Sequence, residues 1–237
     1  MIMKKLEAHS ITGTIHLLSP TRIGGSDDQL EIGGTDLTCI KDVVSGKPYI
    51  PGSSLKGKMR SELEQRHGLA DGGEPFLCKK QKPGGGWDSM KRTELKPEQY
   101  LLGVLFGPHK NTDHDLGPTR IIVRDARCTT ECVEIERKAS TAMDRVTGSA
   151  RRGSLRTEER VAAGTEFELK IVIQVWDLDR EAPNCTHKDK KADEAMIEFV
   201  KEGLLYVQQT GLGSGISKGS GEIEFRDLKL DGQPFTL

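Results

Sequence analysis

The segment IPGSSLKGKMRSELE at residues 50–64 contains residue types that could bind phosphate. Gly52, Gly57 and Lys58 have the spacing of a nucleotide-binding P-loop, in which glycines let the backbone approach phosphates and the lysine contacts the terminal ones. Met59 stands where that motif needs a Ser or Thr hydroxyl for magnesium. Because magnesium takes oxygen ligands, the sequence favours another phosphate-binding arrangement over NTP hydrolysis.

The same segment predicts a helix over about residues 55–65. Ser53 or Ser54 is expected to cap it, because a Ser hydroxyl accepts a hydrogen bond from the unpaired amides of the first turn. A helix N-terminus with Lys56 and Lys58 beside it offers amides, hydroxyls and ammonium groups to an anion such as a nucleic-acid phosphate. An ordinary capped helix with solvated lysines explains this segment equally well.

A second glycine-rich segment, GLGSGISKGSG at residues 211–221, lies between a predicted helix and the last predicted strand. Its G-x-S-x-G pattern is that of a hydrolase nucleophile elbow, but the elbow follows a strand and precedes a helix, which is the reverse order. Backbone amides without side chains can approach phosphate oxygens, and Lys218 adds a positive charge. We expect this loop to contact a polymer backbone; a flexible connection is the alternative.

The stretch over residues 136–161 is basic, since seven Lys and Arg face three Asp and Glu between residues 137 and 160. It is too polar for a core and too long for a tight turn, which leaves a disordered loop or a protruding arm. Met143 and Val146 beside Arg145 could insert between bases while arginines bind phosphates. No segment resembles a groove-reading helix, so the expected ligand is single-stranded nucleic acid.

Cysteines and histidines form no zinc motif. The candidate ligands are His67, Cys78, His109, His114, Cys128 and Cys132. None of them belongs to a pair of CxxC motifs, so a structural zinc is not favoured. Five cysteines at irregular spacing do not form a disulfide framework, and reduced thiols are expected.

The composition predicts a soluble globular protein. The chain has 237 residues, of which 35% are hydrophobic and 30% charged, enough for one elaborated domain or two small ones. No apolar run approaches the roughly 20 residues that span a bilayer, and no signal peptide is evident, so a cytoplasmic location is expected. A net charge of −1 excludes a uniformly basic surface, so any nucleic-acid site must be a local patch.

Hydrophobic patterns predict an α+β fold. Strands are expected over residues 10–18, 165–176 and 222–230 and from Arg120, and helices over about 55–65 and over 192–210. Residues 70–97 are dense in Gly, Pro and Lys and are predicted to be a mobile insertion rather than a core element. The order of elements is that of a split βαβ, ferredoxin-like domain, in which both helices cover one face of the sheet.

Six blocks of sequence carry a family resemblance. They are PGSSLKGKMR (51–60), LFG (105–107), RIIVRDA (120–126), MDRVTGSA (143–150), ERVAAGTEFE (159–168) and GLGSGISKGSGEIEF (211–225). Together they resemble the Csm-type backbone subunit of type III-A CRISPR effector complexes, which belongs to the RAMP superfamily. The resemblance implies one ferredoxin-like or RRM-like RAMP domain over residues 1–237, with a thumb hairpin at about 136–156 and an inserted lid region at about 70–97.

The resemblance implies a function in which a guide RNA directs the protein to its target. Copies of the subunit would stack as a filament along a CRISPR RNA guide, with other type III subunits that include the large polymerase-like one. Each thumb would kink the guide and interrupt its pairing with target RNA. The family's cleavage residue is an Asp in an I-G-x-x-D pattern, here Asp36, which implies cleavage of target RNA that depends on Mg²⁺ or Mn²⁺ held by Asp36. Asp27 and Asp28 of the same loop could assist.

The motifs and the resemblance together name the expected RNA-binding residues. They are Arg22, Ser53, Ser54, Lys56, Lys58, Arg60, Arg145, Gly213, Gly215, Lys218 and Gly219. Arg22 stands where many relatives have His, so it can bind phosphate but cannot transfer a proton near neutral pH. The alternatives are a purely structural RNA-binding subunit, a guide-processing RAMP nuclease and, last, an NTPase.

Overall fold

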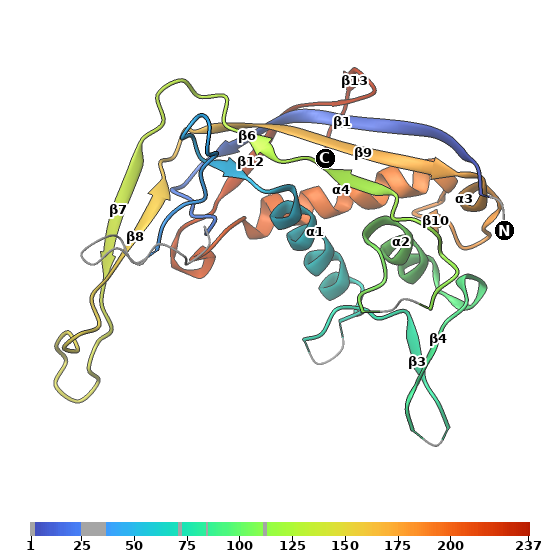
Figure 1. Cartoon of the computed structure of the whole chain (residues 1–237), viewed down its shortest axis with the longest axis horizontal. Helices are drawn as coiled ribbons and strands as arrows, with labels where there is room; N and C mark the ends of the chain where they lie inside the picture. The colour runs from blue at the N-terminus through green and yellow to red at the C-terminus, as the bar shows by residue number, and fades with distance from the viewer. Residues whose placement is uncertain (1–2, 25–36, 71–72, 84, 111–112) are drawn as a thin grey trace.

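The computed structural model describes residues 3–24, 37–70, 73–83, 85–110 and 113–237. A five-stranded antiparallel sheet runs the length of the molecule in the order β13-β12-β1-β9-β5 (Figure 1). The strands are β1 (Lys5–Leu17), β5 (Ile121–Val123), β9 (Glu166–Trp176), β12 (Ile223–Leu230) and β13 (Gln233–Pro234). Apart from the short edge strand β13, this is the strand order of a ferredoxin-like sheet, as predicted.

The long strands bury one face and leave the other polar. In β9 every second side chain from Phe167 to Val175 is buried, and β1 contributes Ile11, Ile15 and Leu17 to the same core. Side chains of a strand alternate between its two faces, so this period of two in the sequence predicted a strand. The apolar face therefore needs a covering layer.

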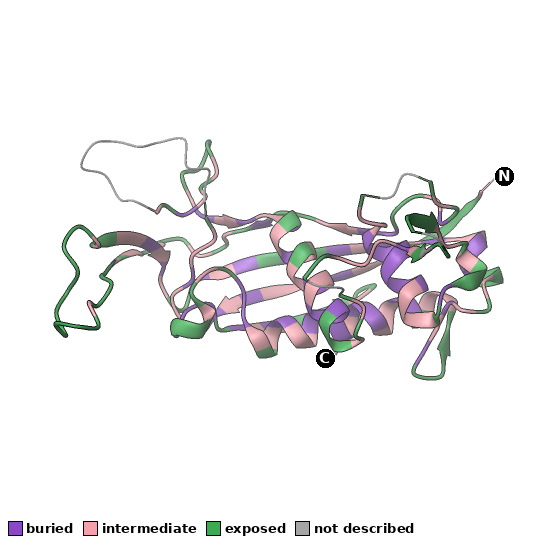
Figure 2. Ribbon diagram, turned by 90° about the horizontal axis from the view of Figure 1, so that it is seen from below, coloured by how far each residue is buried: buried purple, intermediate pink, exposed green. Residues whose placement is uncertain are grey.

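That layer consists of helices on one side of the sheet, as Figures 1 and 2 show. The helices are α1 (Gly52–Arg66), α2 (Pro97–Phe106), α3 (Asp177–Glu181) and α4 (Ala192–Thr210), with short 3₁₀ turns η1 (Arg92–Glu94) and η2 (Ile216–Lys218). Gly203 lets α4 approach α1, because a Cβ there would lie 3.1 Å from Leu63 Cδ1. None of the helices within the described residues is long and apolar enough to cross a membrane.

One helix was not predicted from the sequence, and one sequence expectation needs correction. The apolar run from Tyr100 is part of α2, whose residues from Tyr100 to Phe106 are all buried. The segment 70–97 contains the hairpin β3 (Lys79–Gln81) and β4 (Trp87–Ser89), and it places Cys78 and Leu95 in the core. The expectation that this segment has no core role is therefore wrong for those two side chains.

A buried ion pair joins β5 to α3. Arg120 donates hydrogen bonds to both carboxylate oxygens of Asp179, and both side chains are fully buried. Tyr100 Oη lies 3.1 Å from Asp179 Oδ1, and burial raises the pKa of that phenol.

A long hairpin projects from one end of the sheet (Figure 1). It consists of β7 (Ile135–Ser140) and β8 (Arg156–Val161), which pair antiparallel over their whole length. Its loop leaves Met143, Val146 and Leu155 exposed. Smaller ribbons are β2 (Tyr49–Ile50) with β6 (Ala126–Arg127), and β10 (Thr186–His187) with β11 (Lys190–Lys191).

Candidate nucleic-acid interface

Three segments that are distant in sequence meet where the hairpin leaves the sheet (Figure 1). Thr21 and Val161 exchange backbone hydrogen bonds of 2.9 and 2.8 Å. The amide of Ser214 donates to the carbonyl of Arg22 at 2.9 Å. We call this meeting of residues 20–24, the end of β8 and the loop 211–221 the junction; its backbone pairing fixes the side chains described next.

Two arginines reach the glycine-rich loop at the junction. Arg22 Nη1 lies 3.3 Å from Ser214 Oγ, and Arg160 Nη1 lies 3.3 Å from Ser220 Oγ. Arg160 also donates to Glu136 Oε2 at 3.0 Å. The Nε atoms of both arginines are buried and have no hydrogen-bond partner among the described residues. Both residues are only partly buried, so their guanidinium groups offer positive charge to an anionic ligand.

Arg160 is a residue that sequence reasoning missed. It lies in the block ERVAAGTEFE and was counted only as one charge of a basic stretch. Its position at the junction depends on the pairing of β8 with Thr21, which brings it to a loop 60 residues further along the chain. Its position in a sequence block that carries the family resemblance could have identified it as a candidate.

The glycines of the loop have two different roles. Gly213 has φ +92°, and a Cβ there would lie 2.5 Å from the carbonyl oxygen of Arg22, so its lack of a side chain serves internal packing. Gly219 is left-handed, with φ +80°, and a Cβ there would meet nothing within 4 Å. The amides of Lys218, Gly219 and Ser220 donate within the loop. The expected approach of bare amides to phosphate therefore does not extend to these three, while Lys218 itself is exposed.

The predicted serine cap of α1 is wrong. The helix begins at Gly52 after the N-cap Pro51, and no side-chain cap is formed by Ser53 or Ser54. Instead Asp125 Oδ1 accepts a hydrogen bond from the Gly52 amide at 2.8 Å. Ser53 remains exposed and Ser54 half-buried. A carboxylate from 73 residues away thus occupies part of the expected anion site.

Gly52 also explains why the helix starts there. A Cβ at Gly52 would lie 2.2 Å from the carbonyl oxygen of Val123, so only glycine fits against the end of β5. Asp125 comes two residues after that strand in the block RIIVRDA. An Asp directly after a predicted strand was the signal that could have identified the cap.

Lys56 lies on the first turn of α1 and is half-buried. Burial lowers the pKa of its ammonium group, and the nearby charge of Arg60 lowers it further. Within the part of the chain that the structure describes, Lys56 has no ion-pair partner. A cation in this position is stabilised by an anionic ligand.

Lys58 and Arg60 have internal partners. Lys58 Nζ lies 2.7 Å from Glu62 Oε1. Arg60 donates to Glu64 Oε1 at 2.8 Å and to the carbonyls of Gly107 at 2.8 Å and Phe76 at 3.0 Å. These contacts argue against the RNA-binding role expected for Arg60, because its guanidinium already holds α1 to the segments after it.

Arg145 is exposed in the loop of the hairpin, between the exposed side chains of Met143 and Val146. Asp144 shapes this loop by accepting hydrogen bonds from the amides of Thr147 and Val146, which lower the pKa of its carboxyl. The structure therefore gathers Arg22, Arg160 and the glycine-rich loop at the junction, and presents Arg145 on the arm that starts from it.

The predicted cleavage residue Asp36 and its neighbours Asp27 and Asp28 lie outside the described residues. Leu37 is held against β8, since its amide donates to the Thr157 carbonyl at 3.2 Å and its carbonyl accepts from the Glu159 amide at 2.8 Å. Cys39 is buried beside Glu159, and burial raises the pKa of its thiol to about 11. The described chain thus resumes at residue 37 alongside β8.

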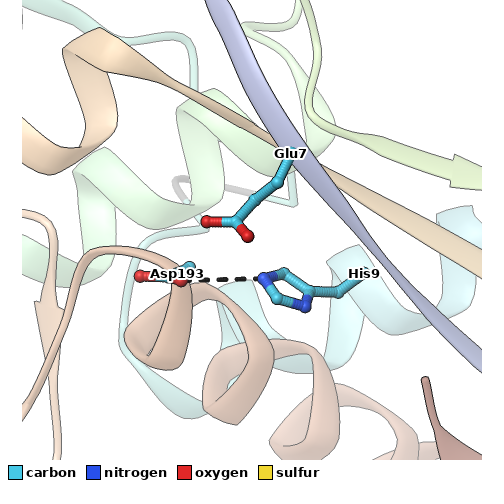
Figure 3. A group of neighbouring side chains, drawn as sticks. All are labelled: Glu7, His9 and Asp193. Carbon is cyan, nitrogen blue, oxygen red and sulfur yellow. Dashed lines mark ion pairs between the residues drawn. The ribbon is translucent and has the colours of Figure 1, made fainter.

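Within the described residues, the nucleotide-binding alternative finds no support in the geometry. Met59 is fully buried in the core, so the P-loop reading has no magnesium ligand at that position. Among the described residues, the side chains that gather in a possible metal-binding group of three are Glu7, His9 and Asp193 (Figure 3), which are not among the candidate zinc ligands of the sequence. Arg180 forms ion pairs with Glu7 and Asp193, so a guanidinium already balances this group.

Residues 14–224 match the RAMP superfamily. The chain belongs to the RAMP superfamily. Among RAMP proteins it is 33% identical over 229 residues to "CRISPR system Cms endoribonuclease Csm3" of Methanocaldococcus jannaschii, covering 94% of this chain and 81% of the relative. It is also 33% identical to the protein of the same name from Mycobacterium tuberculosis, over 92% of this chain and 86% of the relative.

Solved RAMP structures agree with the fold. The Csm3–Csm4 subcomplex of a type III-A CRISPR-Cas interference complex matches 97% of this chain and 80% of the solved chain, with a TM-score of 0.54 and 26% identity. A type III-B Cmr-beta complex bound to cognate target RNA matches with a TM-score of 0.57 at 15% identity, covering 94% of this chain and 61% of the solved one, and supports the fold alone.

Proposed function

We propose that this RAMP protein is the CRISPR RNA-binding filament subunit of a type III-A effector complex and cleaves complementary target RNA. The observation that carries the proposal is the junction, where the partly buried Arg22 and Arg160 converge on the glycine-rich loop. The names of relatives 33% identical over most of the chain support the endoribonuclease activity.

The RNA contacts in this proposal are to phosphate and sugar. Arg22 and Arg160 bind phosphates at the junction, Lys218 and Lys56 flank them, and Arg145 holds the strand at the thumb, the hairpin β7–β8. Such contacts position a strand without reading its sequence, and base pairing with the guide supplies specificity. Met143 and Val146, both exposed, are placed to wedge between bases where the thumb kinks the guide.

The proposed partners follow from this role. They are the guide, the target RNA, further copies of the same subunit along the guide, and the other type III subunits, including the large polymerase-like one. The assembly would work in the cytoplasm. Leu155, also exposed in the loop of the thumb, adds apolar surface to the arm that a neighbouring copy could contact.

In the cleavage step, the thumb's kink splays a target ribose so that its 2′-hydroxyl aligns with the next phosphate. The 2′-oxygen loses its proton and bonds to phosphorus while the P–O5′ bond breaks, which leaves a 2′,3′-cyclic phosphate on one fragment and a protonated 5′-hydroxyl on the other. Alignment supplies much of the acceleration. When bound, Mg²⁺ or Mn²⁺ would supply Lewis-acid stabilisation of phosphoryl oxygens. Asp36 is the proposed metal ligand or orienting group, with Asp27 and Asp28 as accessory groups. The anchoring of Leu37 against Thr157 and Glu159 of β8 supports this assignment.

The test uses the assembled complex with complementary RNA and Mg²⁺. Asp36→Asn should abolish target cutting while guide binding and assembly remain as in the wild type. Asp189→Asn, an isosteric change of an exposed Asp next to the β10–β11 ribbon, serves as the matched control and should cut normally. Retained cutting by the Asp36 variant would move catalysis elsewhere, and no cutting by the wild type would favour a purely structural subunit.

A further inference from the structure

A basic groove lies beside the N-terminus of α1. It is a hollow of about 880 Å³ between the loop 41–49 and the segment 124–128. We define it by its four cations, Lys41, Lys47, Arg124 and Arg127. None of the four was singled out by the motifs.

The cations of the groove differ in how far they are already neutralised. Lys41 forms an ion pair of 3.0 Å with Glu159, and Lys47 Nζ donates to the neutral carbonyl of Thr130 at 2.8 Å. Arg124 and Arg127 are exposed, and their side chains form no ion pair or hydrogen bond with any residue the structure describes. Two guanidinium groups are thus open to a ligand.

The acids of the groove are engaged in local structure. Asp42 Oδ1 accepts hydrogen bonds of 2.8 Å from the amide and the hydroxyl of Ser45. Asp125 accepts from the Gly52 amide, as described above. Neither carboxylate bridges to Arg124 or Arg127, so the groove has a surplus of positive charge facing solvent.

The place of the groove in the fold suggests what it binds. Asp125 lines the groove and also caps α1, so the groove begins where the first turn of α1 presents Ser53 and Lys56. Its rim carries Val43 and Val44, which are 99% and 96% exposed and offer apolar contact to a ribose or base. Guanidinium groups beside exposed apolar side chains suit a flexible polyanion whose bases are unpaired.

We propose that the basic groove is a second binding site for single-stranded RNA, continuous with α1, in which Arg124 and Arg127 each contact a backbone phosphate. This inference rests on the proposed RNA-binding function and extends the path of the strand beyond the junction. The groove adds affinity without sequence preference, because its donors are charged side chains that reach phosphates.

The experiment measures binding of the full chain to a single-stranded RNA of mixed sequence by filter binding at several salt concentrations. The Arg124→Gln/Arg127→Gln variant should bind roughly tenfold more weakly than the wild type, with a salt slope lower by about 1.4, since each lost contact to a single strand removes about 0.7. The control, Lys5→Gln/Lys191→Gln, makes the same charge change on exposed residues at the other end of the sheet and should bind like the wild type (Figure 1).

The outcomes separate the two proposals. If the wild type binds no RNA, the proposed function fails. If the wild type binds and both double variants bind equally well, the groove inference alone is overturned. A groove variant that binds RNA normally but no longer assembles with the other subunits would also overturn it, because the groove would then receive an acidic protein surface. Unchanged melting temperatures confirm that each variant is folded.

Discussion

Two cationic regions of the molecule, the first half of α1 and the loop of the thumb, use the same residue types in opposite surroundings. In α1, Arg60 is largely buried and makes three hydrogen bonds to Glu64, Gly107 and Phe76. In the thumb, Arg145 is exposed among exposed apolar side chains. Both stand in blocks that resemble the same family, yet only the second is available to a ligand.

The difference teaches that the partners of a cation decide its role. An arginine whose donors satisfy buried carbonyls and a buried carboxylate contributes to stability, since removing it leaves those groups unpaired. An exposed arginine contributes little to stability but keeps its donors for phosphate. Lys56 is half-buried and has no acidic partner in the described part of the chain, so it belongs with Arg145 although it lies one turn from Arg60. The comparison therefore distinguishes cations that stabilise the fold from cations that are available to bind RNA.

The largest effect is expected for Arg60→Ala. Glu64, whose side chain is only 5% exposed, would lose its cation, and the carbonyls of Gly107 and Phe76 would lose their donor. The free energy of unfolding should fall by about 3 kcal/mol, as measured by urea denaturation of the isolated subunit. Arg145→Ala is the matched control and should change it by less than about 0.5 kcal/mol. Equal free energies of unfolding for the two variants would contradict the distinction between Arg60 and Arg145.

The next effect concerns RNA binding by the two open cations. Lys56→Ala and Arg145→Ala should each weaken binding of single-stranded RNA roughly tenfold, equally for all sequences, and reduce the salt slope by about 0.7. Filter binding with several unrelated RNA sequences at different salt concentrations measures both quantities. A loss confined to some sequences would show that these side chains read bases, contrary to their assigned contact with phosphate.

The smallest effect is expected for Lys58→Ala. Its partner Glu62 keeps the hydroxyl of Thr210 as a donor at 2.9 Å, so the carboxylate is not left without a hydrogen bond. The cost in stability should be about 0.5 kcal/mol, typical of an i,i+4 pair, and RNA affinity should stay within about twofold of the wild type. A loss as large as that of Lys56→Ala would mean that Lys58 exchanges Glu62 for RNA, which would narrow the distinction between the regions.

The sequence predicted the long elements, whose hydrophobic periodicity extends over many consecutive residues. Residues 165–176 alternate apolar and polar side chains, and 192–210 repeat them at helical spacing, so both became the expected β9 and α4. The run at Tyr100 is apolar on all sides in α2, and such a short run does not distinguish helix from strand by its period. Buried short helices of this kind depend on the core that surrounds them.

Contacts between distant residues account for the rest. The cap of α1 comes from Asp125, and Arg160 joins β8 to the glycine-rich loop at the junction. Neither contact follows from spacing, because each depends on how strands pair. Arg60 likewise gains two of its three partners from Gly107 and Phe76, after the helix has ended. Residue types indicated an RNA-binding protein, but only the fold shows which cations are open.

The most direct test is a map of where RNA contacts the chain. Ultraviolet crosslinking of single-stranded RNA to the full protein, followed by mass spectrometry, should yield crosslinked peptides from the junction, the first turn of α1 and the thumb loop around Met143. Peptides at the start of β1 and of α4, at the other end of the sheet, should remain free of RNA (Figure 1). Crosslinks concentrated at that other end, with none at the junction, would contradict the account.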